Sequence, residues 1–164
     1  MDDSATSSKE HDYERHHELY FDDGDVVLQV DLESVRRDSN QRERKLFCVH
    51  KAVLCAHSIV FSNLFADASA SPESTYDGRP LINMGPDNAV DFADLLQYLY
   101  DPSRYLLRSS GPDTPLELRG LLTFADKVLC NSVRSALIKR VVLDWPTSLE
   151  QWDVRESETQ AFTG

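Results

Sequence analysis

The chain has 164 residues and a mass of 18.6 kDa, which suffices for one domain with a sizeable hydrophobic core. Its formal net charge is −11, and a surface with that charge repels nucleic-acid backbones and anionic lipid headgroups alike. We therefore expect neither nucleic acid nor a membrane among its partners.

Cysteine usage and the composition of the N-terminus predict an intracellular protein. Cys48, Cys55 and Cys130 are too few, and odd in number, for a disulfide framework, which favours a reducing compartment. The N-terminal residues are polar and acidic, and no apolar run approaches the ~18 residues that a membrane span needs. We expect a location in the cytoplasm, the nucleus or both.

The composition of the chain changes near residue 19. Residues 1–18 predict a disordered acidic tail, because Ser, Asp, Glu and His leave little apolar surface to bury. The tail includes His16 and His17, for which we expect no metal-binding or catalytic role. The folded domain is expected over residues 19–146. Residues 147–164 would then form a C-terminal extension that is partly helical or frayed.

Two strands are expected next, joined as a hairpin. Apolar and other side chains alternate over residues 26–32, and this period of two predicts a half-buried strand. Residues 33–43 are charged and predict a solvent loop, and residues 46–49 predict the second strand. The basic run over residues 36–45 is open to two interpretations, a nuclear-import patch or a solvated hairpin loop, and we favour the loop.

A helical pattern begins after His50. Residues 51–56 predict a short helix, and the Ser58 hydroxyl can cap the N-terminus of a second helix. Three apolar residues share one face of that second helix: Phe61, Leu64 and Phe65. Residues 67–80 predict a loop because they are rich in Ser, Pro and Gly, and residues 81–84 predict a short strand.

Two more helices with clear apolar stripes are expected after this strand. Asp87 or Asn88 can cap the first of them. Its stripe has four residues: Phe92, Leu95, Leu96 and Leu99. A loop over residues 101–113 leads to Thr114 and Glu117, which have the spacing of a capping box. The helix that follows has a five-residue stripe: Leu118, Leu121, Leu122, Ala125 and Val128.

A last helix is expected between an Asn131 cap and Pro146. The expected order is therefore strand, strand, helix, helix, strand and three helices. Because strands cluster early and helices dominate later, this order predicts an α+β fold. The apolar stripes of the central helices are expected to pack together as its core.

A metal site is one interpretation of four residues near the hairpin: Cys48, His50, Cys55 and His57. Structural zinc sites use ligand pairs that converge in a tight turn. Here residues 48 and 50 share a strand face, while residues 55 and 57 point about 200° apart on a helix. Convergence is poor, so we expect core thiols and no bound metal or other cofactor.

No catalytic signature stands out in the sequence. It contains no recognisable Ser/His/Asp set, carboxylate pair or glycine-rich phosphate loop. We therefore expect no catalytic residues, although a small enzyme with an unrecognised site stays open as an alternative.

Several motifs, in order, resemble the signature of the BTB/POZ family. Asp25-Val26 opens a strand, and the run LFCVHKAVLCAHSIVFSNLF follows it at residues 46–65. The later stretches LLQYLYD and LLTFADKVLCNSVRSAL resemble helices of the same family. The likeness spans roughly residues 19–146, and the opening DDGDVVLQV looks most like fungal members.

The resemblance implies a small sheet flanked by a cluster of helices. It also implies a protein-interaction module that mediates homodimerisation, partner recruitment or both, without catalysis. The positions of Asp25 and Lys51 resemble a charged pair near the family's dimer groove, so we take both, with His50, as candidate interaction residues. The alternative is that His50 is a satisfied histidine at a corner and that Lys51 is a solvated charge.

Two departures from the family's pattern bear on partners. Many members swap an apolar N-terminal segment when they dimerise, whereas the segment before Leu19 is polar here. Members that recruit a cullin scaffold of ubiquitin ligases often carry a hydrophobic-x-Glu motif, whereas Ser71 precedes Pro72 and Glu73 here. A cullin-type substrate adaptor is therefore the alternative function, with weaker support.

Overall fold

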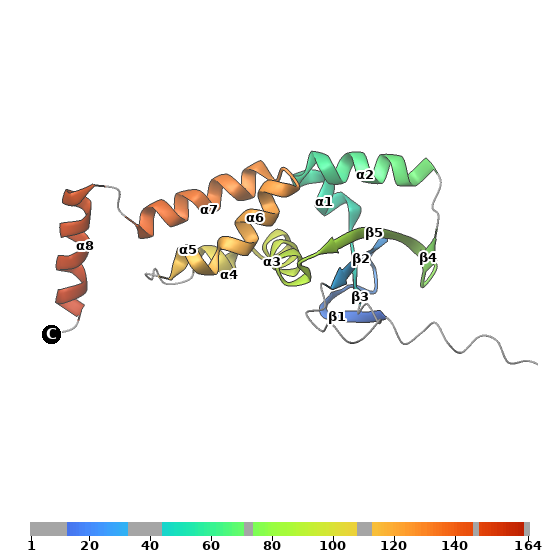
Figure 1. Cartoon of the computed structure of the whole chain (residues 1–164), viewed down its shortest axis with the longest axis horizontal. Helices are drawn as coiled ribbons and strands as arrows, with labels where there is room; N and C mark the ends of the chain where they lie inside the picture. The colour runs from blue at the N-terminus through green and yellow to red at the C-terminus, as the bar shows by residue number, and fades with distance from the viewer. Residues whose placement is uncertain (1–12, 33–43, 71–73, 108–112, 146–147, 163–164) are drawn as a thin grey trace, which may run out of the picture.

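The structure is a computed structural model that describes residues 13–32, 44–70, 74–107, 113–145 and 148–162. Figure 1 shows a small sheet at one end, with helices packed over it and extending away from it. The strands are β1 (Tyr13–Tyr20), β2 (Val26–Leu32), β3 (Arg44–Val49), β4 (Thr75–Tyr76) and β5 (Arg79–Asp87). The helices are α1 (Lys51–His57), α2 (Ile59–Ala70), α3 (Ala89–Tyr100), α4 (Ser103–Leu106), α5 (Thr114–Glu117), α6 (Arg119–Lys127), α7 (Asn131–Asp144) and α8 (Leu149–Phe162).

The sheet has five strands in the order β1-β3-β2-β5-β4. β2 lies at its centre, antiparallel to β3 and parallel to β5. β1 extends the sheet in parallel beside β3, and β4 turns back on β5. Strands precede most of the helices along the chain, so the expected α+β class, a small sheet flanked by helices, is confirmed.

The central strand β2 is buried on both faces. Leu28 and its alternate neighbours belong to the core on the helical side, whereas Val27 packs with Leu46 and Cys48 on the opposite face. Tyrosines cover this second face: Tyr13 and Tyr20 from β1, and Tyr76 from β4. The expectation of a half-buried strand was wrong, because β1 and the β4–β5 hairpin supply a cover that the alternation within β2 does not reveal.

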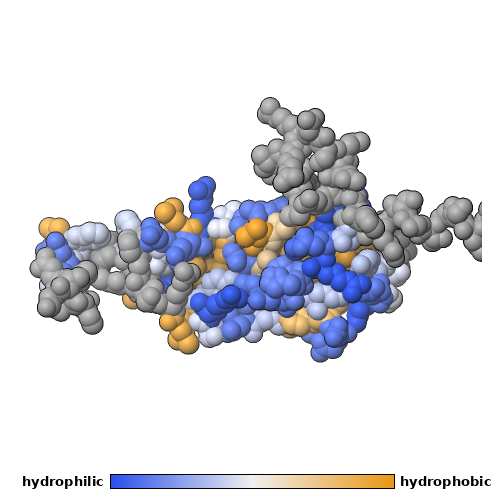
Figure 2. Space-filling model, turned by 90° about the horizontal axis from the view of Figure 1, so that it is seen from below, coloured by the Kyte–Doolittle hydropathy of each residue, from blue (hydrophilic) through white to orange (hydrophobic). Residues whose placement is uncertain are grey.

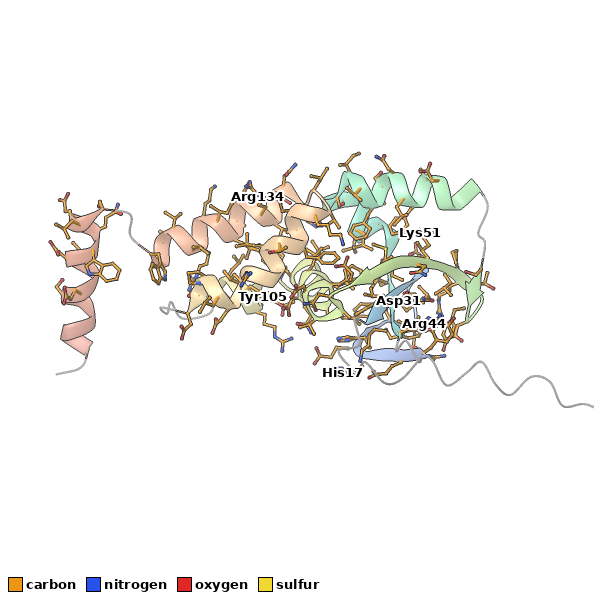
Figure 3. The ribbon with its side chains drawn as sticks, in the orientation of Figure 1. His17, Asp31, Arg44, Lys51, Tyr105 and Arg134 are labelled. Carbon is orange, nitrogen blue, oxygen red and sulfur yellow. The ribbon has the colours of Figure 1, made fainter. Side chains whose placement is uncertain are left out.

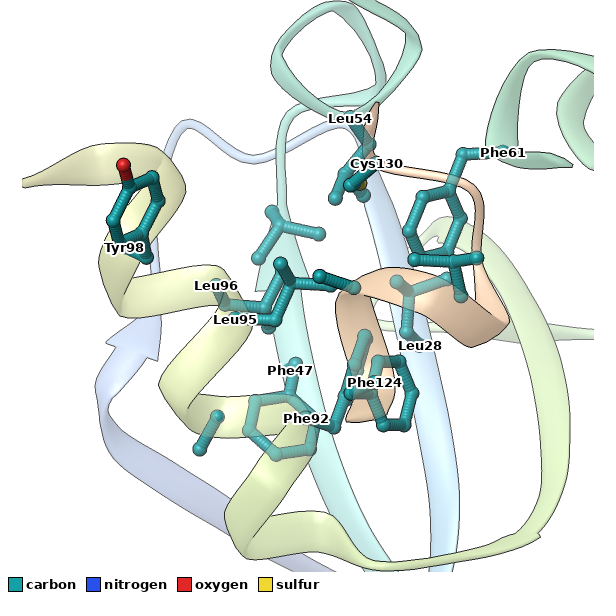
Figure 4. Close-up of a cluster of buried hydrophobic side chains, with 14 of the residues drawn as sticks. Leu28, Phe47, Leu54, Phe61, Phe92, Leu95, Leu96, Tyr98, Phe124 and Cys130 are labelled. Carbon is teal, nitrogen blue, oxygen red and sulfur yellow. The ribbon is translucent and has the colours of Figure 1, made fainter. Parts of the chain in front are cut away.

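The main core lies between the sheet and the helices α1–α3, α6 and α7. Phe92 of α3 stands near its centre, with ring centroids at 5.0 Å from Phe47, 5.1 Å from Phe124 and 6.4 Å from Phe61 (Figure 4). The predicted stripes of the central helices meet here, with Leu64, Leu99 and Leu122 at the margin of the cluster. The prediction that these stripes form one core is confirmed.

The N-terminal segment is ordered earlier than its composition suggested. β1 begins at Tyr13, and two of its side chains, His16 and Leu19, are buried. The expectation of disorder up to residue 18 was therefore wrong for residues 13–18, because pairing with β3 and burial of His16 and Leu19 compensate for a polar composition. Residues 1–12 lie outside the described part of the chain.

The segments between the main elements contain more structure than expected. α2 runs to Ala70, and a hairpin follows whose turn, Asp77-Gly78, has two positive φ angles of 51° and 73°. Two consecutive residues with positive φ form a tight turn whose twist matches that of the two strands it joins. β5 covers nine residues, beyond the predicted 81–84, and α4 occupies part of the predicted loop over 101–113.

Two of the four predicted helix caps are observed. The Ser58 hydroxyl accepts a hydrogen bond from the Phe61 amide at 3.2 Å, and the Asn88 side chain accepts from Val90 and Asp91. The other two caps were misplaced by one residue. The N-cap positions are Asp113 and Cys130, so Thr114 and Asn131 are the first helical residues of α5 and α7.

The C-terminal extension contains a helix, α8, which Figure 1 shows at the far end of the molecule from the sheet. α7 ends at Asp144, one residue before Trp145 and two before Pro146, as the proline predicts. Within the described residues, no helix combines the length and the apolar character that crossing a bilayer requires.

Candidate functional site

The three candidate interaction residues meet at one corner of the sheet, where β2 begins and β3 passes into α1. The Asp25 amide donates to the Val49 carbonyl at 3.0 Å, which places the start of β2 beside the end of β3. The Lys51 amide then donates to Asp25 Oδ1 at 2.7 Å. We call this region, formed by residues 21–25 and 49–51 with Arg79 and Tyr100, the corner.

Asp25 caps helix α1 from a neighbouring strand. The N-cap residue of α1, His50, makes no side-chain hydrogen bond to the first turn, so the Asp25 carboxylate supplies an acceptor for a first-turn amide instead. Asp25 and Lys51 therefore meet through the Lys51 backbone amide and not as a pair of charged side chains. Among the described residues, the Lys51 ammonium forms no ion pair, so its charge is available at the surface (Figure 3).

His50 is held between a half-buried tyrosine and an exposed carboxylate. The His50 amide donates to the Tyr100 hydroxyl oxygen at 3.0 Å, and His50 Nδ1 lies 2.9 Å from the same oxygen. The Tyr100 O–H can donate to Nδ1 in the tautomer that carries the ring proton on Nε2. Nε2 faces Asp23 Oδ1 at 3.3 Å.

The loop before β2 depends on a glycine and an arginine. Gly24 lies so close to β3 that an added Cβ would stand 2.7 Å from Cys48 Sγ and 3.0 Å from two backbone atoms. Arg79 of β5 donates from Nε to the Gly24 carbonyl at 2.7 Å and from a terminal nitrogen to the Asp22 carbonyl. The loop is therefore fixed in place, and its acidic side chains project into solvent.

Three residues of the corner were missed by the sequence analysis: Phe21, Arg79 and Tyr100. The Phe21 ring lies 4.7 Å from that of Tyr100 and 5.6 Å from that of His50. Tyr100 is the second tyrosine of the LLQYLYD stretch, so its position in the motif was a signal that could have been used. Burial raises the pKa of Tyr100, so its hydroxyl stays protonated and able to donate.

The surface of the corner combines charges of both signs with small apolar groups. Asp22, Asp23 and Asp25 are exposed, and Lys51 is half-buried beside them. The adjoining side of α1 exposes two alanines, and Ile59 at the start of α2 is 58% exposed. Such a surface can contact another protein through a small apolar patch with charges at its edge.

The four residues considered for a metal site do not lie together. Cys48 belongs to the cluster on the outer face of the sheet, whereas Cys55 packs against the main core on the other side. Burial raises the pKa of the Cys48 and Cys130 thiols, which favours the unreactive protonated form. No group of three or more potential metal ligands occurs in the described ranges.

His16 and His17 lie on β1 instead of in a disordered tail. His16 is buried, stacks at 5.2 Å on Phe47, and accepts the Leu19 amide on Nδ1 at 3.2 Å. These contacts hold β1 against β3, so His16 has a structural role. His17 is exposed beside it.

One pair of perturbed groups lies elsewhere, between α3 and α4. The Tyr105 hydroxyl donates to Asp94 Oδ1 at 3.3 Å, and burial, followed by the Asp94 charge, raises the pKa of Tyr105 to about 12. Burial also raises the pKa of Asp94. A tyrosine with a pKa this far above 7 is a poor acid or base at pH 7. The hydrogen bond between Tyr105 and Asp94 therefore has a structural role, which is to join α3 to α4.

Two features of the sequence analysis lie outside the described residues. They are the segment 71–73, which bears on cullin recruitment, and residues 36–43 of the basic run. The last two residues of that run, Arg44 and Lys45, belong to β3.

A family model described as the BTB/POZ domain matches residues 21–137 of the chain. Among solved structures, the BTB domain of zebrafish PATZ1 is similar, with 24% identity and a TM-score of 0.43, over 72% of this chain and 75% of that chain. No curated protein matches. The likeness to fungal members stays a prediction. The family match includes the corner and the helices packed around the core.

Proposed function

Because this chain belongs to the BTB/POZ domain family, and is therefore a protein–protein interaction module, we propose that two copies associate through the corner. The candidate residues Asp25, His50 and Lys51 would then lie at or beside the contact. Recruitment of other proteins through the same surface is the second part of the proposal. We further propose that the module has no catalytic activity.

The observation that carries the homodimer proposal is the arrangement of charge at the corner. The Lys51 ammonium forms no ion pair within the described residues, while the carboxylates of Asp22 and Asp23 are exposed beside it. In a two-fold dimer each surface contacts its own copy, so a patch with both signs of charge can be self-complementary. Lys51 of one copy would then face the acidic loop of the other.

Rigidity of the corner supports the same proposal. The backbone of the acidic loop is tied to Arg79, and α1 is tied to β2 through Asp25. A surface that is already ordered loses little conformational entropy when it binds. The small apolar groups of α1, with Ile59, offer the uncharged centre that a stable contact needs.

The proposal that the module is not an enzyme rests on its membership of an interaction family. Burial raises the pKa of Tyr105, Cys48 and Cys130 away from neutrality, whereas catalytic acids and bases are tuned towards the working pH. Burial raises the pKa of Asp94 towards neutrality, but its carboxylate accepts a hydrogen bond from the Tyr105 hydroxyl.

Light scattering of the purified chain over about 1–100 µM tests the homodimer proposal, since micromolar dissociation constants fall in this range. We expect a dimer whose dissociation constant rises about tenfold in Lys51→Glu, because the new carboxylate faces the acidic loop. Lys51→Arg is the matched control, and it should keep the affinity of the unchanged chain.

A zero-length carboxyl-to-amine crosslinker locates the contact in a mixture of isotopically light and heavy chains. We expect crosslinks between Lys51 of one label and Asp22 or Asp23 of the other. A monomer at every concentration would overturn the proposal, and so would a dimer with equal affinity in Lys51→Glu and Lys51→Arg.

A further inference from the structure

The helix α7 has apolar side chains on two opposite sides. Its inner side packs into the core through Val133 and Leu137. Its outer side exposes Ile138, Val142 and Leu143 in the second half of the helix, where Val142 is 50% and Leu143 is 66% exposed. An apolar stripe on a helix normally packs against another surface, so the outer stripe of α7 has the character of a buried surface.

The helix α8 carries apolar side chains of its own. Leu149 is 78% and Trp152 is 49% exposed, and their spacing of three residues places both on one face of α8. The Trp152 ring meets that of Trp145 at a centroid distance of 6.5 Å. Figure 1 shows α8 standing beyond the end of α7, and Figure 2 shows apolar side chains at the surface of this end of the molecule.

We propose that α8 of one copy packs against the outer side of α7 of a second copy, in a reciprocal exchange of C-terminal helices. The surface involved consists of Ile138, Lys139, Val142 and Trp145 on one copy, and Leu149, Trp152 and Glu156 on the other. It lies at the end of the molecule away from the corner and goes beyond the proposed function.

Charge complementarity indicates that the helix that binds the outer side of α7 comes from a second copy of the chain. α7 carries three basic residues and one acidic residue, although the chain as a whole has a net charge of −11. α8 carries four acidic residues and one basic residue. An acidic helix with an apolar face therefore complements α7, and every copy of the chain brings one.

The spacing of the side chains gives the pairing a consistent register. Glu156 lies four residues after Trp152 and seven after Leu149, on the same face of α8. Lys139 precedes Val142 by three residues on the outer side of α7. When the helices run antiparallel with Trp152 beside Val142, Leu149 meets Trp145 and Glu156 reaches Lys139.

The junction between the helices favours a second copy over the same chain. Trp145 has extended backbone angles, φ −122° and ψ 92°, and Pro146 follows it. Proline disfavours the α conformation of the residue before it. The extended angles of Trp145 end the helical course of α7, and Figure 1 shows α8 beyond the end of its own α7 and not alongside it. A short connection between two helices favours exchange between copies.

Tryptophan fluorescence reports on this surface alone, because the two tryptophans of the chain are Trp145 and Trp152. We expect the emission of the whole chain to move to shorter wavelengths as its concentration rises over about 0.1–100 µM, a range centred on micromolar affinities. Lys139→Glu and Glu156→Lys should each weaken this transition about tenfold or more, because each places like charges together.

Mixing the two variants separates exchange from folding back. In an equimolar mixture, each contact joins an acidic position to a basic one only when the two helices come from different variants. We therefore expect the mixture to recover the transition. Lys51→Glu, the same charge reversal at the corner, should leave the fluorescence transition unchanged. The exchange of helices can therefore fail while the corner dimer is confirmed, and the corner dimer can fail while the exchange is confirmed.

Three results would overturn the exchange. One is an emission wavelength that does not change with concentration, whether it is typical of exposed or of buried tryptophans. Another is a transition that survives both reversals. The third is loss in both variants without recovery on mixing, while their thermal unfolding matches that of the unchanged chain.

Discussion

Tyr100 holds the corner together through one hydroxyl group. It accepts the His50 amide and lies 2.9 Å from His50 Nδ1, so it fixes the residue at which β3 passes into α1. A part-buried amide that loses its acceptor costs about 1–3 kcal/mol of folding free energy. We therefore expect Tyr100→Phe to lower the free energy of unfolding in urea by that amount.

Tyr98 offers a matched control on the same helix. It is buried, and its hydroxyl forms no hydrogen bond with the described residues. Tyr98→Phe should therefore cost clearly less than Tyr100→Phe. An equal loss in the two variants would show that the hydroxyl of Tyr100 contributes nothing specific to the corner.

His16 should make the stability depend on pH. Burial, followed by the neighbouring His17, lowers the pKa of His16 in the folded chain. The unfolded chain binds its proton near pH 6.5, so the folded chain binds fewer protons just below that value. The contribution of neutral His16 is complete above about pH 6.5 and is lost as the pH falls towards the lower folded pKa.

His16→Asn should remove this part of the pH dependence. Its side-chain oxygen can accept the Leu19 amide in place of Nδ1 but does not titrate. Urea unfolding between pH 7.5 and 5.5 measures the effect, with the exposed His17→Asn as the control on the same strand. A loss of stability that is identical in all three chains would assign the dependence to other groups.

At the scale of the element, Phe61 is the most deeply buried of the described side chains that fix α2 to the core. Phe61 is fully buried, and its ring stacks on Phe65 at 5.9 Å and contacts Phe92 at 6.4 Å. Phe61→Ala should lower the free energy of unfolding by about 3–5 kcal/mol, because it removes the buried ring and leaves a cavity. Ile59→Ala, two residues earlier and 58% exposed, should change it far less. An unchanged melting temperature for Phe61→Ala would contradict the packing of α2 against α3.

Periodicity predicted the elements that bury one continuous stripe. The stripes of α2, α3 and α6 lie in the core, and β2 and β3 occupy the predicted segments. β1 was missed because its pairing with β3 links residues about thirty positions apart, and its polar side chains give no local signal. The caps of α5 and α7 were misplaced by one residue, since their neighbours also have capping side chains or close a tight turn.

The candidate site was predictable only in part, for a similar reason. Its chain positions, Asp25, His50 and Lys51, could be taken from the motif. The contacts of Tyr100 with His50 and of Arg79 with the loop involve α3 and β5, far along the chain, and the Lys51 amide finds its acceptor in Asp25 of a neighbouring strand start. Such contacts arise from the tertiary fold, and no pattern within one element encodes them.

At the scale of the whole molecule, two proposed surfaces lie at opposite ends. The corner belongs to the sheet end, and the outer side of α7 with α8 belongs to the other end. Each surface contacts its own copy, so a chain that uses both would join its neighbours in a line instead of stopping at a closed pair. Light scattering of Lys51→Glu and Lys139→Glu, singly and combined, separates the two contributions.

Net charge should make the association at the corner stronger in salt. Two copies that each carry −11 repel one another over the whole molecule, whereas the local attraction of Lys51 acts at a few positions. The Debye length falls from about 10 Å at 0.1 M salt to about 3 Å at 1 M, so salt removes most of the long-range repulsion and leaves apolar contact little changed. We expect a dissociation constant that falls as salt rises from about 0.1 to 1 M, measured by light scattering.

Lys51→Glu makes each copy more negative and should steepen this dependence of the dissociation constant on salt. A monomer at about 100 µM in both salts, far above a micromolar dissociation constant, would contradict the homodimer itself. A dimer that salt weakens would show that local charge pairs outweigh the net repulsion.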